Sequence, residues 1–238
     1  MSNLLTLMAD FSELGDSVAP EVYFYLGPIA VNETLRNSLI VIAFIILLAA
    51  IVRIFVIPRF KFVPRGFQCF LEWIVSTFDT MASNMTGKLG KFLGPYTFGA
   101  AAFICFGVLL ELFGLRSPIA DLNTCVSLSM MTFILINFFG IQKHGPIGRI
   151  KYYFKPSVIV GPFRIISDLM VPVSMALRLF GSVLSGLITM ELVYLVLPIW
   201  LSFGIPAVLS VVFTLFHAFI QAYVFAILTL TFIQEATE

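Results

Sequence analysis

Charged side chains are scarce in this sequence. Asp, Glu, Lys and Arg make up 11% of its 238 residues and apolar residues 60%, whereas a soluble domain carries about 25% and ~45–50%. So few charges cannot coat the surface of a globule of this size, and the mean hydropathy of +1.03 agrees. The composition therefore excludes a soluble protein and predicts an integral membrane protein.

Cysteine and enzyme signatures are also sparse. Cys69, Cys105 and Cys125 are widely spaced, without a CxxC pattern or a nearby His, so we expect buried small apolar side chains rather than a disulfide framework or a metal site. No HExxH, GxSxG, GxxxxGK or GxGxxG motif occurs, which predicts no nucleotide site, no catalytic residue and no cofactor. The net charge of +1 comes with short basic clusters that indicate membrane topology rather than a nucleic-acid partner.

Long apolar runs predict an all-α integral membrane protein with about five membrane-embedded helices. These helices are expected at about 37–57, 95–113, 125–141, 157–197 and 207–233. The charge-free stretch 192–234 would, as one helix, be about twice as long as the hydrocarbon core is thick. Because Pro198, Gly204 and Pro206 interrupt it, we expect the last two helices to form a long, strongly tilted hairpin.

Charges next to these runs predict the orientation of the chain. Basic residues cluster at 53–65 and again at 143–155, and the positive-inside rule places both clusters in the cytoplasm. Residues 1–36 are then an outer N-terminal segment, too acidic for a signal peptide, and residues 37–238 are a single membrane domain. The segment 67–91 is predicted to be an amphipathic helix or hairpin at the inner interface, because Glu72 and Asp79 share a face.

Arg178 is the most informative residue of the sequence. It lies deep inside an apolar segment, where a charge costs at least ~2.5–3.5 kcal/mol. Asp168 and Glu191 are ten and thirteen positions away, too far for pairing within the helix, so we expect the counter-charge to come from another subunit. Small residues at spacings of four, including Gly181 and Ser185, suit either a helix–helix interface with that subunit or close packing within the chain.

Further polar residues of the membrane domain are candidates for an ion route. His217 and Gln221 lie one turn apart, and a hairpin would bring Gln221 opposite Arg178–Ser182. Glu111, Asp121 and Asn123 cluster near the outer ends of two spans, where water could reach them; solvation and helix capping by Asn123 or Thr124 are the alternatives. Asp168 either pairs with Arg164 one turn earlier or belongs to an inner route.

Three segments carry a resemblance to a known family. In chain order they are SPIADLNT, ALRLFG around Arg178, and IQAYVFAILTLTFI. Over most of its length the chain resembles subunit a of the bacterial F-type ATP synthase membrane sector, in which these segments occur in the same order. The resemblance implies a stator subunit with two offset half-channels that carry H⁺, or alternatively Na⁺, to and from the carboxylates of a c-subunit ring. It implies the c ring, peripheral-stalk b subunits, the remaining ATP synthase subunits and the lipid bilayer as partners.

The same resemblance assigns the family's essential Arg to Arg178, its Gln of the last helix to Gln221, and an Asn position to Ser182. Relatives carry an acidic residue where this chain has Leu187, and His or Glu where it has Thr214. Displaced equivalents are then Glu191 and His217. We assign Glu111, Asp121, Asn123, Glu191 and His217 to an outer route and Asp168 to an inner one.

Two other functions remain open from the residues alone. In a solute transporter Arg178 would bind an anion, although the paired broken helices or repeats of such proteins are not visible. In an intramembrane enzyme Glu191 and His217 would act as acid and base, although no nucleophile or set of metal ligands accompanies them.

Overall fold

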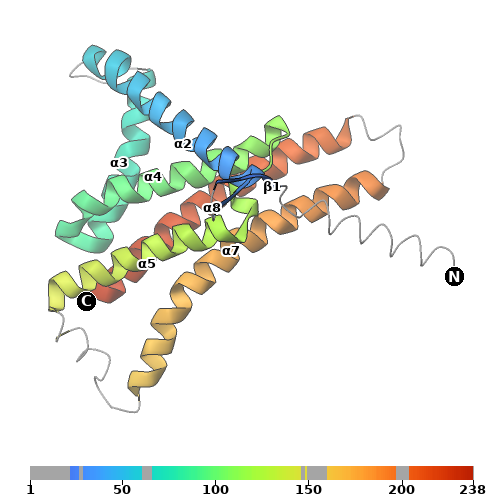
Figure 1. Cartoon of the computed structure of the whole chain (residues 1–238). Helices are drawn as coiled ribbons and strands as arrows, with labels where there is room; N and C mark the ends of the chain where they lie inside the picture. The colour runs from blue at the N-terminus through green and yellow to red at the C-terminus, as the bar shows by residue number, and fades with distance from the viewer. Residues whose placement is uncertain are drawn as a thin grey trace.

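The computed structural model describes residues 22–26, 29–60, 66–145, 148, 160–196 and 204–237. Figure 1 shows a body of long helices with a small β ribbon beside the start of α2. The elements are, in chain order, β1 (Val22–Leu26), β2 (Ile29–Asn32), α2 (Glu33–Ile51), the short helical turns η1 (Val52–Val56) and η2 (Ile57–Arg59), α3 (Phe67–Thr86), η3 (Gly87–Leu89), α4 (Gly90–Leu109), η4 (Leu110–Phe113), η5 (Pro118–Ala120), α5 (Leu122–His144), α7 (Val160–Val196) and α8 (Ile205–Thr237).

Five of the described helices are long and apolar enough to cross a membrane: α2, α4, α5, α7 and α8. This confirms the predicted all-α membrane fold. The last two are the longest, with 37 residues in α7 and 33 in α8, whereas an upright span needs about 20. Helices α2 and α4 begin earlier than the apolar runs suggested, because hydropathy marks the hydrocarbon-crossing part of a helix and not its polar first turns.

A short β ribbon precedes α2 and was not predicted. Strands β1 and β2 pair antiparallel with Leu26 opposite Ile29, and β2 ends at Asn32, directly before α2. The aromatic and β-branched residues of VYFYL favour a strand. The predicted outer segment 1–36 therefore includes both strands and the first turn of α2, while residues 1–21 lie outside the described part of the chain.

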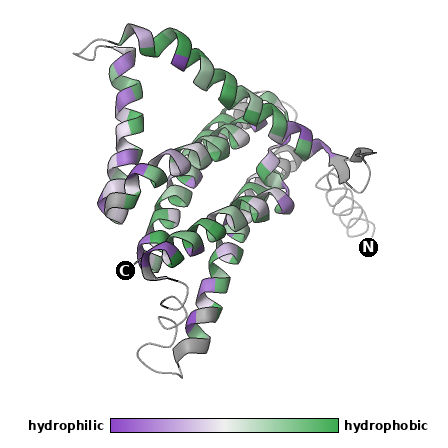
Figure 2. Ribbon diagram, turned by 60° about the vertical axis from the view of Figure 1, so that its left-hand side comes forward, coloured by the Kyte–Doolittle hydropathy of each residue, from purple (hydrophilic) through white to green (hydrophobic). Residues whose placement is uncertain are grey.

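Helix α3 lies between η2 and α4 in chain order. It is amphipathic, as Figure 2 shows by the alternating purple and green of its ribbon. The segment 67–91 consists of α3, the turn η3 and the first two residues of α4, so the hairpin is formed by α3 with the whole of α4. Gly90 permits this contact, because a Cβ atom there would lie 2.5 Å from the Cα atom of Ser83. Cys69 is exposed on α3 and Cys105 is half-buried, so the prediction that all three cysteines are buried is confirmed only for Cys125.

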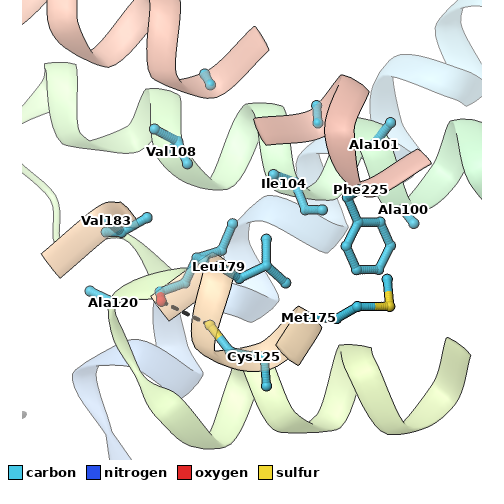
Figure 3. Close-up of a cluster of buried hydrophobic side chains, with 14 residues drawn as sticks. Ala100, Ala101, Ile104, Val108, Ala120, Cys125, Met175, Leu179, Val183 and Phe225 are labelled. Atoms are coloured by element: carbon cyan, nitrogen blue, oxygen red, sulfur yellow. Dashed lines mark hydrogen bonds between the residues drawn. The ribbon is translucent and has the colours of Figure 1, made fainter. Parts of the chain in front are cut away.

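The main hydrophobic core lies where α4, α5, α7 and α8 meet. Figure 3 shows Ile104 and Val108 of α4, Leu179 of α7 and Phe225 of α8 in this cluster. Cys125 of α5 is buried there, and its thiol donates a hydrogen bond to the Ile119 carbonyl oxygen at 3.1 Å. This packing fixes α7 and α8 against the rest of the bundle.

Helix α2 is peripheral. Only 6% of its span is buried, compared with 28–33% in the other four, and Figure 1 shows it leaning away from the bundle. Its first turns are held by partly buried polar contacts: Thr34 Oγ1 donates to Asp121 Oδ2 at 3.0 Å, and Asn37 Nδ2 donates to the Arg116 carbonyl oxygen at 2.8 Å. The apolar remainder of α2 is left for lipid or another protein to cover.

Helix α7 bends along its length (Figure 1). Pro172 lies inside it, where its ring removes one backbone hydrogen bond and opens the helix. The hydroxyl of Ser129 on α5 donates to the Pro172 carbonyl oxygen at 2.7 Å and is buried. The bend therefore coincides with a fixed contact between α5 and α7, and it separates Asp168 from Arg178.

Candidate functional site

Arg178 lies on an exposed face of α7, although its neighbour Leu179 is fully buried in the core. Among the described residues its guanidinium has no hydrogen-bond or ion-pair partner. Ser174, Gly181 and Ser185 are exposed on the same face at helical spacing, and a Cβ atom on Gly181 would meet nothing within 4 Å. The small-residue face is therefore not used for packing within the described chain, and it surrounds a charge without a local partner.

Gln221 has the opposite environment. Its side chain is 6% exposed, one turn after His217 on α8. Leu179, which follows Arg178, and Ala222, which follows Gln221, belong to the same buried cluster. The register that places Gln221 opposite Arg178–Ser182 stays a prediction.

A cavity of about 250 Å³ lies between the end of α4, the second half of α7 and the first half of α8. It brings together three predicted site residues, Glu111, Ser182 and His217, and also Leu187 and Thr214. The remaining lining residues are Val183, Gly186, Met190, Ser210 and Phe213. The cavity is large enough for several water molecules.

Two polar atoms at this cavity are buried and lack a hydrogen-bond partner among the described residues: Glu111 Oε1 and His217 Nε2. An unsatisfied buried polar group costs about 1–3 kcal/mol, and both groups line a space that can hold water. Ser182 Oγ donates to the Leu179 carbonyl oxygen at 2.9 Å, so its proton is used within α7. The cavity is therefore lined by one carboxyl group and one imidazole, each with a buried polar atom that has no partner among the described residues.

Helix α8 carries a polar stripe that the sequence analysis recognised only in part. Ser210, Thr214, His217 and Gln221 follow at spacings of four, three and four, so they share one face. The first three line the cavity and the fourth is buried beyond it. The spacing is visible in the sequence, but only the structure shows that this face turns towards Glu111 and α7.

Asp121 and Asn123 lie elsewhere. Both line a separate groove of about 520 Å³ between α2, α4 and α5, together with Thr34. Asp121 Oδ1 accepts from the Asn123 backbone N–H at 3.1 Å and caps α5, so Asp121 and not Asn123 or Thr124 is the cap. The structure thus does not bring these two residues to the cavity of Glu111 and His217. Glu191 lies on α7, but its side chain is outside the described part of the structure.

Asp168 lies in the first half of α7, before Arg178, whereas the cavity of Glu111 and His217 lies after Arg178 along this helix. It lines a small cavity of about 20 Å³ with Arg164 of the same helix and Glu235 at the end of α8. Such a space holds about one water molecule. Glu235 was missed in the sequence, because the apolar run of α8 ends before it; the antiparallel hairpin brings the end of α8 beside the start of α7.

No group of three or more His, Cys, Asp and Glu residues in the described ranges could hold a metal ion. A family model described as ATP synthase A chain matches residues 38–234. The chain belongs to this family. ATP synthase subunit a of Moorella thermoacetica is 34% identical over 218 residues, which cover 91% of this chain and 95% of that protein.

Other relatives agree. ATP synthase subunit a 1 of Hahella chejuensis is 28% identical over 226 residues, covering 94% of this chain and 92% of that protein. Subunit a of a Sulfurihydrogenibium species is 33% identical over 179 residues, covering 73% and 84%. Membership confirms the resemblance in the sequence and makes the chain a multi-pass stator subunit of the membrane sector of a rotary ATP synthase. It disfavours the solute transporter and the intramembrane enzyme.

Proposed function

We propose that this chain supplies the stationary ion path of the membrane sector, with two half-channels that meet a ring of c subunits at Arg178. The observation that carries the proposal is the state of Arg178: an exposed guanidinium, unpaired within the described chain, on a face of small residues. A charge at membrane depth needs a partner. A carboxylate of the ring, passing close to the small-residue face, provides one.

The positive charge of Arg178 then acts as an electrostatic gate between the two half-channels. A ring carboxylate crosses the lipid-facing arc in neutral form, carrying H⁺ or, as the alternative, Na⁺. Near Arg178 the always-protonated guanidinium favours the charged form of the ring carboxylate. The carboxylate must therefore release its ion before it moves past Arg178. The same positive charge repels cations and prevents direct leakage from one half-channel to the other.

The two cavities support offset routes. The cavity at Ser182–Met190 lies after Arg178 along α7, and the cavity at Arg164–Val171 lies before it. At ~1.5 Å rise per residue, the first is centred roughly 12 Å and the second roughly 16 Å from Arg178 along the helix axis. We assign the first to the outer half-channel and the second, with Asp168, to the inner one. Each unit charge that crosses the membrane then contributes ~2.3 kcal/mol of driving free energy per 100 mV of transmembrane potential.

The orientation and the partners follow from the same proposal. The ribbon before α2 faces outward, the basic loops face the cytoplasm of a bacterial cell, and the exposed apolar surface of α2 contacts lipid or a peripheral-stalk b subunit. The remaining ATP synthase subunits couple ring rotation to ATP formation.

A substitution at Arg178 tests the proposal. In the intact complex, reconstituted in vesicles, Arg178→Ala should abolish coupled ATP synthesis while passive ion conduction persists. Arg53→Ala is the matched control, because Arg53 is an exposed arginine in η1, remote from α7, and it should leave synthesis unchanged. Normal coupled synthesis in Arg178→Ala would place the gate elsewhere.

A further inference from the structure

We infer that the groove between α2, α4 and α5 binds one phospholipid with a primary ammonium headgroup, phosphatidylethanolamine, whose ammonium is held by Asn32 and Asp121. The inference goes beyond the proposed function and needs neither the gate at Arg178 nor the half-channels. It takes from the proposed orientation only that the groove opens to the outer leaflet of the membrane.

The groove is as deep as one leaflet. Its lining runs from Asn32 to Ile42 on α2 and from Asp121 to Met131 on α5. The hydrogen bond from Thr34 to Asp121 places the first turns of both helices at the same end of the bundle. Each wall covers ten positions, which at ~1.5 Å rise per residue is about 15 Å, half of a hydrocarbon core ~30 Å thick. A helix of another subunit would need the full thickness, so these dimensions favour an acyl chain.

The lining changes from polar to apolar along this depth. Beyond the mouth, the hydroxyl groups of Ser38 and Ser127 donate to carbonyl oxygens of their own helices, at 2.9 and 2.8 Å, so their protons are not offered to the groove. The deepest lining residues are apolar: Ile42, Phe103, Leu128 and Met131. A molecule that fits this gradient has a polar end at the mouth and hydrocarbon below it, because a polar group placed at the apolar end would lose its hydrogen bonds.

The mouth of the groove offers hydrogen-bond acceptors. Asn32 is the N-cap residue of α2, yet its side chain makes no capping hydrogen bond, and its Oδ1 atom is buried without a partner among the described residues. Asp121 is the only charged residue in the described lining. The Thr34 hydroxyl and the Asn123 N–H donate to its two oxygens, but neither neutralises its charge.

These acceptors select the headgroup. A buried amide oxygen beside a carboxylate is best satisfied by a cation that carries N–H bonds. A primary ammonium has three N–H donors, whereas the quaternary ammonium of phosphatidylcholine has none. The outer N-terminal segment of the chain is a poor occupant, because it would bring like charge to Asp121. Residues 1–21 contain no Lys or Arg and four acidic residues: Asp10, Glu13, Asp16 and Glu21.

A photo-reactive lipid tests the site. The complete complex is reconstituted in vesicles that contain phosphatidylethanolamine with a diazirine in its acyl chain, and the adducts are located by peptide mass spectrometry. We expect adducts on the segments of α2, α4 and α5 that line the groove. A phosphatidylcholine probe with the same acyl chain should label these segments on the order of tenfold less, because it cannot donate to Asn32 or Asp121.

Substitutions in the groove sharpen this test. Met131→Trp fills the apolar end and should lower labelling by the phosphatidylethanolamine probe on the order of tenfold, with unchanged subunit composition. Met130→Trp is the matched control, since Met130 is also an exposed methionine of α5 but lies outside the described lining. Asn32→Ala removes one acceptor without removing a cap, and it should reduce the preference for phosphatidylethanolamine over phosphatidylcholine.

Three results would overturn the lipid site: equal labelling by the two probes, unchanged labelling in Met131→Trp, or cross-links from the groove to another subunit in place of lipid. Arg178→Ala should leave the labelling unchanged while it abolishes coupled synthesis. Failure of the lipid site and failure of the gate are therefore read from different measurements.

Discussion

Thr34 and Asp121 are 87 positions apart in the sequence and are joined by a hydrogen bond of 3.0 Å from the Thr34 hydroxyl to the Asp121 Oδ2 atom. The other carboxylate oxygen of Asp121 accepts the Asn123 N–H and caps α5. One side chain therefore starts α5 and fastens the peripheral helix α2 to the bundle.

This double role predicts a stability effect. Asp121→Ala removes the cap and the α2 contact, and we expect a loss of about 1–3 kcal/mol, since a cap contributes ~1 kcal/mol and a hydrogen bond ~0.5–1.5 kcal/mol. Thermal unfolding of the detergent-solubilised complex is the measurement. Thr34→Val, which removes only the contact to α2, should cost less. Equal stability of Asp121→Ala and the unaltered chain would contradict the capping geometry.

The contact between α3 and α4 predicts intolerance at Gly90. A Cβ atom there would meet the Ser83 backbone at 2.5 Å, so Gly90→Ala must push the helices apart, at a cost of about 1–3 kcal/mol. Expression level and thermal stability measure this. Gly99→Ala is the matched control on the same helix, because a Cβ atom at Gly99 has nothing within 4 Å; a comparable loss in both variants would rule out the steric explanation.

Charge and geometry at Arg178 can be separated with Arg178→Lys. The substitution keeps a positive charge but replaces a planar fork with a flexible, strongly hydrated ammonium. We expect coupled ATP synthesis to fall on the order of 10²-fold, with a smaller passive leak than in Arg178→Ala. Ion flux and synthesis in the same vesicles give both values. A leak as large as that of Arg178→Ala would mean that charge alone does not close the gate.

The inner route predicts an effect of charge at the cavity of Asp168 and Glu235. Asp168→Asn should slow ion flux several-fold without releasing the subunit from the complex, because the cavity would lose a carboxylate close to the inner end of the path. Glu235→Gln should have a weaker effect, since Glu235 is more exposed and water can take its place. If Asp168→Asn sustains full flux, Asp168 does not belong to the path.

The exposed Cys69 offers a native reporter of topology. If α3 lies at the cytoplasmic interface, a membrane-impermeant maleimide should modify Cys69 from the cytoplasmic side of closed vesicles and not from the outside. Phe113→Cys in a Cys69→Ser background should show the reverse, because Phe113 is 80% exposed at the opposite end of α4. Labelling of both positions from one side would refute the proposed orientation.

The sequence by itself determined the membrane fold and singled out the residue that we propose as the gate. In a bilayer, spanning helices must be long and apolar, so five such runs are visible without any tertiary contact. The cost of a buried charge makes Arg178 conspicuous for the same reason. The break at Pro198–Pro206 indicated the α7–α8 hairpin because proline and glycine act on their own backbone.

Only the tertiary structure decided which polar residues belong together. Glu111 and Asp121 look alike in the sequence, ten positions apart at the ends of two spans, yet Glu111 lines a cavity with His217 while Asp121 is consumed by a cap and by Thr34. Glu235 likewise joins Asp168 only because α8 returns beside the start of α7. Apolar periodicity specifies which face of a helix is buried, but helix rotation and crossing depend on side-chain packing across the whole bundle, and that packing decides where each carboxyl group points.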